Sequence, residues 1–323
     1  MNILVTGGAG FIGSHFVKYM LSTYPGCLIV NYDFLTYAGN LETLREIEGN
    51  SKHIFVKGSI NDSELLHETM RKHSIDIIVH FAAETHVDKS IQSSSRFTQT
   101  NLGGTQVLLD AALTFQVDRY IQISTDEVYG SLGDTGSFQE TDSLLPNSPY
   151  SASKAGADLL ARAYYKTYGL PVVITRCSNN YGSFQHPEKV IPLFITNALV
   201  KKQLPVYGSG KNVRDWIHVR DHCSAIDAVL HRGSLGETYN VGGSNERSNI
   251  ELAELILYEL GLPSSFIEFV ADRPGHDYRY AIDSSKLINS LGWKPEISFT
   301  DGLKETITWY MQNEDWWKPL KPF

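Results

Sequence analysis

The chain has 323 residues, of which 42% are hydrophobic and 20% charged, and its net charge is −8. This is the composition of an ordinary globular protein, long enough for one large domain or two modest ones. The acidic balance argues against a surface for nucleic acid or an anionic membrane, either of which needs a basic patch. It leaves room for a small anionic ligand, which a few well-placed arginines can bind.

The three cysteines, Cys27, Cys177 and Cys223, are widely spaced. They fit neither a disulfide framework nor a zinc site, so we expect reduced packing residues. Met1–Gly7 lacks the basic region and long apolar core of a signal peptide. No run approaches the ~18 apolar residues of a membrane span. We therefore expect a cytoplasmic protein.

Roughly the first 175 residues alternate between strand-like and helical patterns. Apolar runs predict strands at Ile3–Thr6, Leu28–Tyr32, His53–Val56, Asp76–His80, Tyr120–Ser124 and Val172–Arg176. Helical patterns lie between them, at Phe11–Leu21, Ser63–Lys72, Thr98–Phe115 and Tyr150–Tyr168. Repeated βα units predict an α/β fold with a doubly wound, parallel Rossmann sheet and right-handed crossovers.

The pattern loosens after Cys177, where prolines and glycines break it into short pieces. Helical patterns return at Asp221–His231, Ile250–Leu260, Ser284–Leu291 and Gly302–Gln312. We interpret this half as a smaller mixed α/β region that caps the edge of the sheet. The expected division assigns 1–182 and 218–244 to a dinucleotide-binding domain, and 183–217 and 245–323 to a substrate-binding domain.

A glycine-rich turn follows the first predicted strand and opens the first predicted helix. The segment Gly7–Gly13 satisfies GxGxxG from Gly8 and the related GxxGxxG spacing from Gly7. Glycines permit a tight turn and let backbone amides approach a pyrophosphate at the positive end of a helix. The pattern alone would also fit an ordinary glycine-rich turn, but its position between strand and helix predicts a dinucleotide site.

Asp33 ends the second strand about 20 residues past the last glycine, where an acidic residue binds the adenosine ribose. Its charge would repel a 2′-phosphate and no arginine adjoins it, which favours NAD over NADP. Ser59-Ile60, after the third strand, and Phe81-Ala82-Ala83-Glu84, after the fourth, are expected to flank the cofactor. On sequence alone these could equally be ordinary loop residues.

Tyr150 and Lys154 lie four residues apart, on one face of a predicted helix. The charge of the lysine is expected to lower the pKa of the tyrosine and favour phenolate. A phenolate beside a nicotinamide can accept an alcohol proton while a hydride leaves the carbon. In a chain with 17 tyrosines such a pair also arises by chance, so its weight comes from the dinucleotide fold and a strand-end hydroxyl at Thr125.

Asp126 and Glu127 stand where the fifth predicted strand runs out into a loop. Two carboxyls in one desolvated site cannot both ionise easily, so their pKa values separate and one can act as acid, the other as base. Such a pair suits elimination of water across adjacent carbons after a neighbouring alcohol has become a ketone. The alternative without a catalytic role is a solvated acidic turn or a helix N-cap.

Three segments, Gly7–Gly13, Ser124–Gly130 and Tyr150–Lys154, together resemble the extended short-chain dehydrogenase/reductases. The triplet Thr125-Asp126-Glu127 is similar to that of the dTDP-glucose 4,6-dehydratases within that family. The resemblance covers nearly the whole chain, including Cys177–Gly182, Arg214–Trp216 and Ala271–Asp277. It implies a redox-neutral lyase with tightly bound NAD, acting on dTDP-glucose to give the 4-keto-6-deoxy sugar.

The resemblance also assigns roles. Tyr150 would take the C4 hydroxyl proton with help from Thr125, Glu127 would remove the C5 proton, and Asp126 would protonate the departing C6 hydroxyl. The implied cofactor contacts are Gly7, Gly10, Phe11, Ile12, Gly13, Asp33, Phe34, Leu35, Thr36, Ser59, Ile60, Phe81, Ala82, Ala83, Glu84, Thr100, Tyr150, Lys154 and Asn180.

The implied substrate contacts come mostly from the second half of the chain. They are Thr85, Thr125, Asn179, Lys189, Val190, Pro205, Val206, Tyr207, Arg214, Asn249, Asp272, Arg273, Pro274, Gly275 and His276. Arg214 and Arg273 suit a pyrophosphate because guanidinium makes paired, charge-assisted hydrogen bonds. By resemblance, Thr98–Phe115 and Tyr150–Tyr168 would form the four-helix contact of a homodimer. We expect no partner of nucleic acid or membrane.

Two further features of the sequence are expected to have no catalytic role. His80 and His86 are not at metal-ligand spacing and lack a third ligand, so we expect structural histidines and no metal. Trp316–Leu320 is expected to be a packed tail, or a cover for a surface or partner. The alternatives left open are another nucleotide-sugar dehydratase, an epimerase or decarboxylase of the same superfamily, and a catalytically silent NAD-binding sensor.

Overall fold

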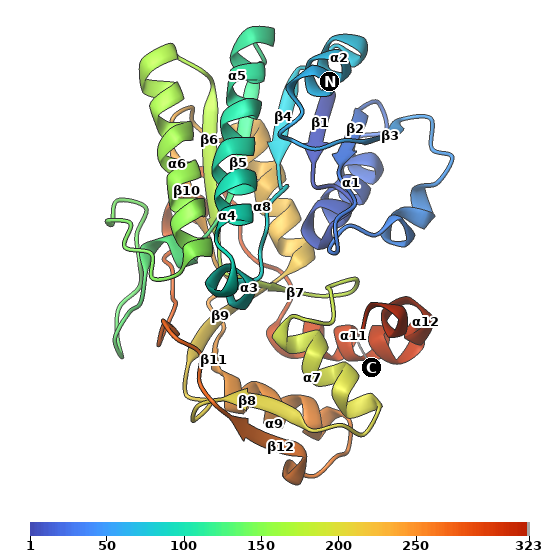
Figure 1. Ribbon diagram of the computed structural model, residues 1–323, viewed down its shortest axis with the longest axis vertical. Coiled ribbons are helices and arrows are strands. Elements are labelled where there is room, and N and C mark those ends of the chain that lie inside the picture. Colours follow the sequence, from blue (N-terminus) through green and yellow to red (C-terminus); the bar gives the residue numbers. More distant parts are fainter. Residues whose placement is uncertain (322–323) are drawn as a thin grey trace.

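The computed structural model describes residues 1–321. The larger part of the protein is built on a parallel sheet of seven strands (Figure 1). The strands lie in the order β10-β6-β5-β4-β1-β2-β3. They span Asn2–Thr6 (β1), Leu28–Asp33 (β2), His53–Lys57 (β3), Ile77–His80 (β4), Arg119–Thr125 (β5), Val172–Cys177 (β6) and Thr238–Val241 (β10). The predicted α/β class and doubly wound Rossmann sheet are confirmed, whereas the prediction missed β10.

The direction in which the chain builds the sheet reverses beside β1. The chain moves outward from β1 through β2 to β3, then returns to pair β4 with the other side of β1 and continues through β5 and β6. The loops that leave β1 and β4 therefore diverge toward opposite faces of the sheet. In open α/β sheets the crevice at this point, beyond the carboxyl ends of the strands, is where ligands bind.

Helices cover both faces of the sheet, which is the arrangement that buries parallel strands. One layer consists of α1 (Phe11–Thr23), α8 (Val219–Arg232) and α10 (Ser285–Leu291), and the other of α2 (Ser63–His73), α5 (Thr105–Phe115) and α6 (Pro149–Tyr168). Successive side chains of β1 point to opposite faces of the sheet, so Ile3 and Val5 belong to one core and Leu4 belongs to the other.

The predicted helix over 98–115 contains a π-helical segment. A short helix, α4 (Ser95–Phe97), leads into the π-helical turn Thr98–Gly104, which continues as α5. Asn101 in this turn accepts a hydrogen bond from the Glu84 amide at 2.8 Å and donates one to the Glu84 carbonyl at 3.0 Å. The π-helical turn therefore fixes the loop after β4, and π-helical turns of this kind are frequent at functional sites.

The smaller region has two short sheets, ordered β11-β9-β7 and β12-β8, and a core of its own that includes Phe194, Leu252 and Trp317. Its elements are β7 (Asn179–Tyr181), α7 (Val190–Leu199), β8 (Leu204–Tyr207), β9 (Val213–His218), β11 (Glu246–Ser248), α9 (Asn249–Glu259), β12 (Ile267–Val270), α11 (Phe299–Gln312) and α12 (Glu314–Trp317). In Figure 1, α3 (Val87–Gln92) and β7 lie between this region and the large sheet.

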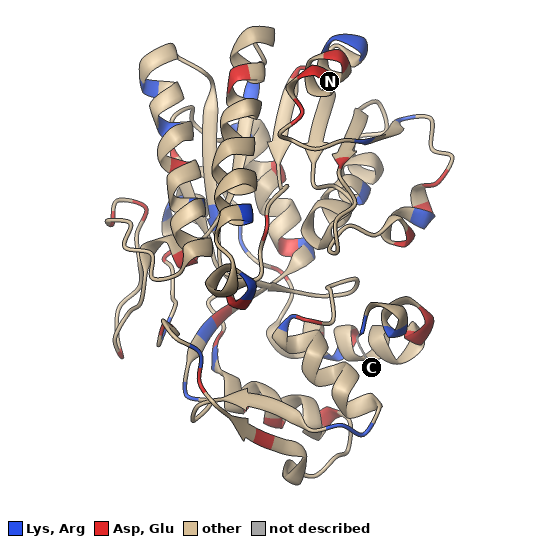
Figure 2. Cartoon of the chain, in the orientation of Figure 1, with Lys and Arg blue, Asp and Glu red and all other residues tan. Residues whose placement is uncertain are grey.

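Charged side chains of both signs are interspersed over the chain, and both occur where α3 meets the smaller region (Figure 2). Cys27, Cys177 and Cys223 are buried free thiols. Within residues 1–321, no helix is long and apolar enough to cross a membrane. In the same range, no group of three or more His, Cys, Asp or Glu side chains is arranged to hold a metal ion.

A buried ion pair joins β6 to α6. The Arg176 side chain donates to Asp158 and to the Tyr129 hydroxyl, each at 2.9 Å, and both charged side chains are almost fully buried. Arg176→Met should lower the free energy of unfolding by about 3–5 kcal/mol, because the Asp158 carboxylate would be left buried without its cation. Chemical denaturation monitored by fluorescence measures this.

Arg220→Met is the matched control for that experiment. Arg220 pairs with Glu305 on the surface, where each side chain is about half exposed, so its loss should cost less than about 1 kcal/mol. Equal destabilisation by the two substitutions would contradict the structural role of the buried pair.

Candidate active site

A cavity of about 330 Å³ opens at the carboxyl edge of the large sheet, beside the point where the strand order reverses. Its lining includes all five predicted catalytic residues: Thr125, Asp126, Glu127, Tyr150 and Lys154. It also includes every predicted cofactor contact except Leu35. Leu35 has a positive φ of 55° and its side chain packs against the hydrophobic core instead.

The glycine-rich turn is held in a shape that only glycine permits. Gly7 has a φ of +72°, and a Cβ added there would lie 2.6 Å from the Ala82 amide nitrogen. A Cβ added at Gly13 would lie 2.3 Å from the Gly7 carbonyl oxygen. The first helix, α1, begins directly after Gly10 and no side chain caps it. Its free amides and its positive end therefore face the cavity and fit a dinucleotide pyrophosphate.

Asp33 is fixed at the end of β2 by backbone amides. One carboxylate oxygen accepts from Ala9 at 2.9 Å and the other from Leu35 at 2.7 Å. Burial raises the pKa of this carboxyl, while the two amide hydrogen bonds act in the opposite direction. Each oxygen keeps a further lone pair, so the group can also accept from the hydroxyls of a ribose.

The paired carboxyls sit on a short 3-10 helix, Asp126–Tyr129, which begins where β5 ends. Thr125 caps this helix: its hydroxyl accepts from the Glu127 amide at 3.3 Å and donates to Asp126 Oδ1 at 3.2 Å. Asp126 Oδ2 is buried and has no hydrogen-bond partner among the described residues. The alternative of a solvated acidic turn does not fit, because Asp126 is only 1% exposed.

The two carboxyls differ in their electrostatic surroundings. Burial raises the pKa of Asp126 well above its ordinary value, and the neighbouring charge of Glu127 adds to the effect. Burial also raises the pKa of Glu127, but the cations Arg273, Arg214 and Lys189 all oppose this rise. The two carboxyls therefore differ in proton affinity, and Asp126 holds its proton more tightly than Glu127 does.

Tyr150 lies in the first turn of α6. This helix starts with Pro149 after a capping box in which the Ser148 hydroxyl accepts from the Ser151 amide at 3.1 Å. The expectation that Lys154 lowers the pKa of Tyr150 was wrong for the protein alone. Burial raises that pKa well above its ordinary value, and the charge of Glu127 adds to it.

Lys154 is hydrogen-bonded to the sheet. Its ammonium donates to the Ile123 carbonyl on β5 at 2.6 Å, and burial lowers its pKa. It is thus tied to the sheet backbone rather than to the phenol. The neighbour that lowers the pKa of Tyr150 is the Thr125 side chain.

The predicted substrate contacts divide into two groups. Thr85, Thr125, Asn179 and Lys189 line the cavity. The others lie outside its lining: Val190, Pro205, Val206, Tyr207, Arg214, Asn249, Asp272, Arg273, Pro274, Gly275 and His276. In the first group, Asn179 Oδ1 is buried and has no hydrogen-bond partner among the described residues.

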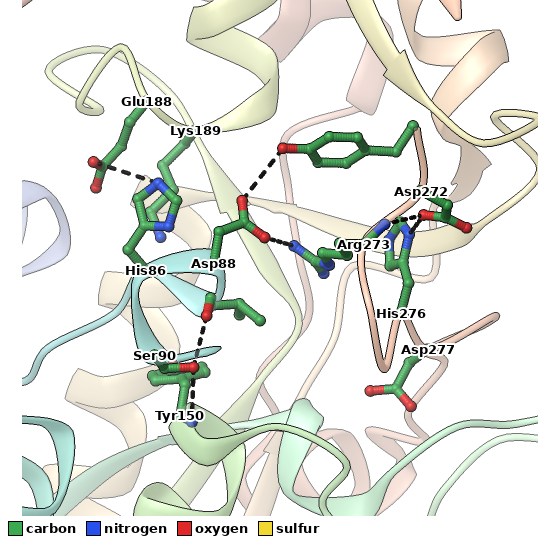
Figure 3. A network of polar contacts seen from close by, with 12 residues as sticks. His86, Asp88, Ser90, Tyr150, Glu188, Lys189, Asp272, Arg273, His276 and Asp277 are labelled. Carbon is green, nitrogen blue, oxygen red and sulfur yellow. Dashed lines mark hydrogen bonds and ion pairs between the residues drawn. The ribbon is translucent and has the colours of Figure 1, made fainter. Parts of the chain in front are cut away.

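Polar contacts around α3 lie between the two groups (Figure 3). Lys189 donates to the Thr85 carbonyl at 2.8 Å, and Arg273 lies 3.5 Å from the Asp88 carboxylate on α3. The Arg214 guanidinium is buried and donates to backbone carbonyls, including that of Asp277 at 2.9 Å. Both arginines therefore lie near Glu127. Backbone carbonyls already balance part of the charge of Arg214, and the Asp88 carboxylate part of that of Arg273.

Several residues that line the cavity were not predicted, among them Tyr37, Phe184, His186, Glu188, Trp316 and Leu320. The segment Gln185–Glu188 directly precedes the predicted Lys189, so its position could have been inferred by continuity. His80 is structural as predicted, since its ring lies between the Thr6 and Thr105 hydroxyls at 2.7 and 3.1 Å.

The Rossmann sheet carries a glycine-rich turn after β1, an acidic residue at the end of β2, and Tyr150 with Lys154 on α6. Together these features define the class of NAD-dependent short-chain dehydrogenase/reductases. The chain belongs to the GDP-mannose 4,6 dehydratase family, whose model matches residues 4–306.

Among its relatives, a dTDP-glucose 4,6-dehydratase from Actinoplanes is 52% identical over 322 residues, covering 98% of this chain and all of the relative. The dTDP-glucose 4,6-dehydratase DesIV from Streptomyces venezuelae, solved with NAD bound, superposes with a TM-score of 0.97 at 53% identity. A dTDP-glucose 4,6-dehydratase from Bacillus anthracis, also in complex with NAD, gives 0.94 at 55% identity. Each of these two structures aligns with 99% of this chain and 100% of its own.

Proposed function

We propose that this chain is an NAD-dependent dTDP-glucose 4,6-dehydratase, a hydro-lyase that yields dTDP-4-keto-6-deoxyglucose. The observation that carries the proposal is the Asp126–Glu127 pair, buried in the same cavity as Tyr150 and surrounded asymmetrically by charge. Simple alcohol oxidation needs no carboxyl pair, whereas loss of water needs an acid and a base on neighbouring carbons. Relatives of this activity match the chain at more than half identity over nearly its full length.

The residues divide the reaction into proton transfers. Tyr150 takes the proton of the sugar C4 hydroxyl, which Thr125 helps to hold, and C4 becomes a ketone. NAD⁺, held by the glycine turn and Asp33, would supply a hydride acceptor at C4 and the same hydride for C6, and its positive charge would lower the pKa of a nearby phenol. The ketone acidifies the C5 hydrogen, which Glu127 removes.

Asp126 completes the elimination by giving its proton to the C6 hydroxyl, which leaves as water. After C6 has received the hydride, a proton returns to C5 from Glu127. The sugar has lost one water overall, and neither the cofactor nor the protein has been oxidised or reduced. Exchange with solvent removes the proton gained by Tyr150 and restores the one lost by Asp126.

We place the nucleotide diphosphate between the cavity and the smaller region. Asn179 and Lys189 line the cavity on that side, and Arg214 and Arg273 are the nearby cations named above. Because Arg273 lies 3.5 Å from Asp88, a diphosphate would take over the position of a carboxylate that this guanidinium already recognises. The separate core of the smaller region supports a division at 183–217 and 245–323, although α10, within the latter range, packs on the large sheet.

We further propose a cytoplasmic homodimer. Its contact would use the helices at 98–115 and Pro149–Tyr168, which expose apolar side chains at Leu113, Leu159 and Tyr168. Free thiols at all three cysteines suit a reducing compartment.

The activity is tested by incubating the purified protein with dTDP-glucose and, separately, with UDP-glucose, and measuring the products by mass spectrometry. We expect dTDP-glucose to lose one water, and UDP-glucose to react more slowly or not at all. A product of unchanged mass with altered sugar stereochemistry would indicate an epimerase. A protein that binds NAD and leaves both sugars untouched would indicate a sensor.

A further inference from the structure

The segment Glu314–Leu320, near the end of the described residues, reaches the cofactor side of the cavity. It consists of α12 and a final 3-10 turn, Lys318–Leu320. Trp316 and Leu320 line the same cavity as Gly10 and Asp33, which lie at the other end of the sequence. Figure 1 shows α12 in red, beside α11 and on the side of the smaller region that faces α1. We call residues 314–320 the C-terminal clasp.

The clasp is anchored through one tryptophan and faces the cavity with the other. Trp317 is 1% exposed and its indole donates to the Tyr310 carbonyl at 2.8 Å, which fixes it in the core of the smaller region. The indole nitrogen of Trp316 makes no hydrogen bond to the described residues. Aromatic packing therefore holds this ring, with centroids 5.2 Å from Trp309 and 5.5 Å from Phe184.

Phe184 connects the clasp to the helix that receives the dinucleotide. It also lines the cavity, and its ring lies 6.0 Å from His15 on α1, with the Lys18 ammonium 4.2 Å from its centroid. The backbone beside it is tied to the same helix, since His15 Nε2 lies 2.9 Å from the Ser183 carbonyl oxygen. An aromatic wall thus runs from α1 through Phe184 to Trp316.

A second set of contacts closes the other end of this wall. Glu188 pairs with Lys89 of α3 at 2.9 Å, and Lys89 lies 3.7 Å above the ring of Tyr37. The Tyr37 ring packs edge-on against His186 at 5.9 Å. The segment 183–189 is therefore held to the Rossmann side at both ends, with the clasp packed against it through Phe184.

We propose that Trp316 and Leu320 are cofactor-site residues, and that the C-terminal clasp slows the release of NAD by walling the dinucleotide cavity with apolar surface. The inference rests on the proposed function, because a redox-neutral cycle uses NADH formed in the first step to finish the last one. Release of NADH in between would leave an oxidised sugar without its reductant. A wall that retains the cofactor therefore keeps NADH in place until the last step. An enzyme that exchanges its cofactor in every turnover would instead have to open such a wall each time.

The test measures how fast bound NAD leaves the holoenzyme. Protein loaded with radiolabelled NAD is diluted into excess unlabelled NAD, and retained label is followed by rapid filtration. Trp316→Ala and Leu320→Ala should each release NAD about tenfold faster than the unmodified protein, as expected for the loss of one substantial apolar contact. Trp316→Phe, which keeps an aromatic ring in the wall, should restore most of the slow release.

Tyr258→Ala is the matched control, because it removes an aromatic ring from the same region at a position that is 79% exposed and does not line the cavity. Its release rate should equal that of the unmodified protein. Unchanged release in both Trp316→Ala and Leu320→Ala would overturn the proposal. If Trp316→Ala does not fold, Leu320→Ala decides alone. The measurement needs no sugar substrate, so a holoenzyme that fails to dehydrate dTDP-glucose would contradict the proposed function without touching this result.

Discussion

Tyr150→Phe is expected to reduce turnover roughly 10²- to 10⁴-fold, the range that a positioned proton-transfer group contributes. The substitution removes one hydroxyl and keeps the ring, which is buried and packs against Phe97, so fold and NAD content should stay the same. The affected step is the first, because the C4 hydroxyl then has no base to take its proton. In a single-turnover experiment, the absorbance of enzyme-bound NADH should fail to appear when substrate is added.

Tyr164→Phe provides the comparison for this variant. It makes the same change on the same helix, but its hydroxyl donates to Asp110, at 2.5 Å, away from the cavity. It should turn over at the unmodified rate. If Tyr150→Phe still reduces NAD at the first step, the phenol is not the base.

Asp126→Asn is expected to slow water loss by roughly 10²- to 10⁴-fold while sparing C4 oxidation. Its buried surroundings favour the neutral acid, so a neutral amide of the same shape should fit without loss of stability. It cannot, however, give a proton to the leaving hydroxyl. Enzyme-bound NADH should therefore form at the normal rate and then persist, instead of being consumed.

Hydrogen exchange at C5 separates the two carboxyls. In deuterated water, Asp126→Asn should still exchange the C5 hydrogen of bound substrate, because Glu127 remains to remove it. Glu127→Gln should form NADH and show no such exchange. Equal loss of oxidation and elimination in Asp126→Asn would contradict the separate roles of acid and base.

The strands of the large sheet were largely predictable because each is an apolar run bounded by turns. The exception is β10, which has four residues and no sustained apolar pattern. The helix α7 was missed for a different reason: Pro192 was interpreted as a break in the chain. It is the third residue of the helix, where the backbone amide has no partner within the helix and proline therefore costs little.

The candidate site was predictable where function depends on local sequence. The glycine turn, Asp33 and the Thr125–Glu127 triplet lie directly after strands whose carboxyl ends meet at one edge, so sequence order predicts their proximity. The pKa of Tyr150 was not predictable in this way. Helical spacing places Lys154 on the same face, but only the fold shows that its ammonium is hydrogen-bonded to β5.

The position of Trp316 could not be predicted from the sequence pattern either. Two adjacent tryptophans predict burial, but only the packing of the smaller region decides which of them is the anchor and which one faces the cavity. The same limit applies to Arg273, whose pairing with Asp88 joins segments from the two halves of the chain.

The two amide hydrogen bonds of Asp33 carry a consequence for redesign. Its carboxylate holds Ala9, inside the glycine turn, and Leu35, in the loop after β2. A smaller neutral residue at this position, chosen to admit a phosphorylated ribose, would also release both loops. Cofactor preference and the shape of the phosphate cradle are therefore coupled through one side chain. An engineered switch to NADP would need a second substitution that fastens the turn again.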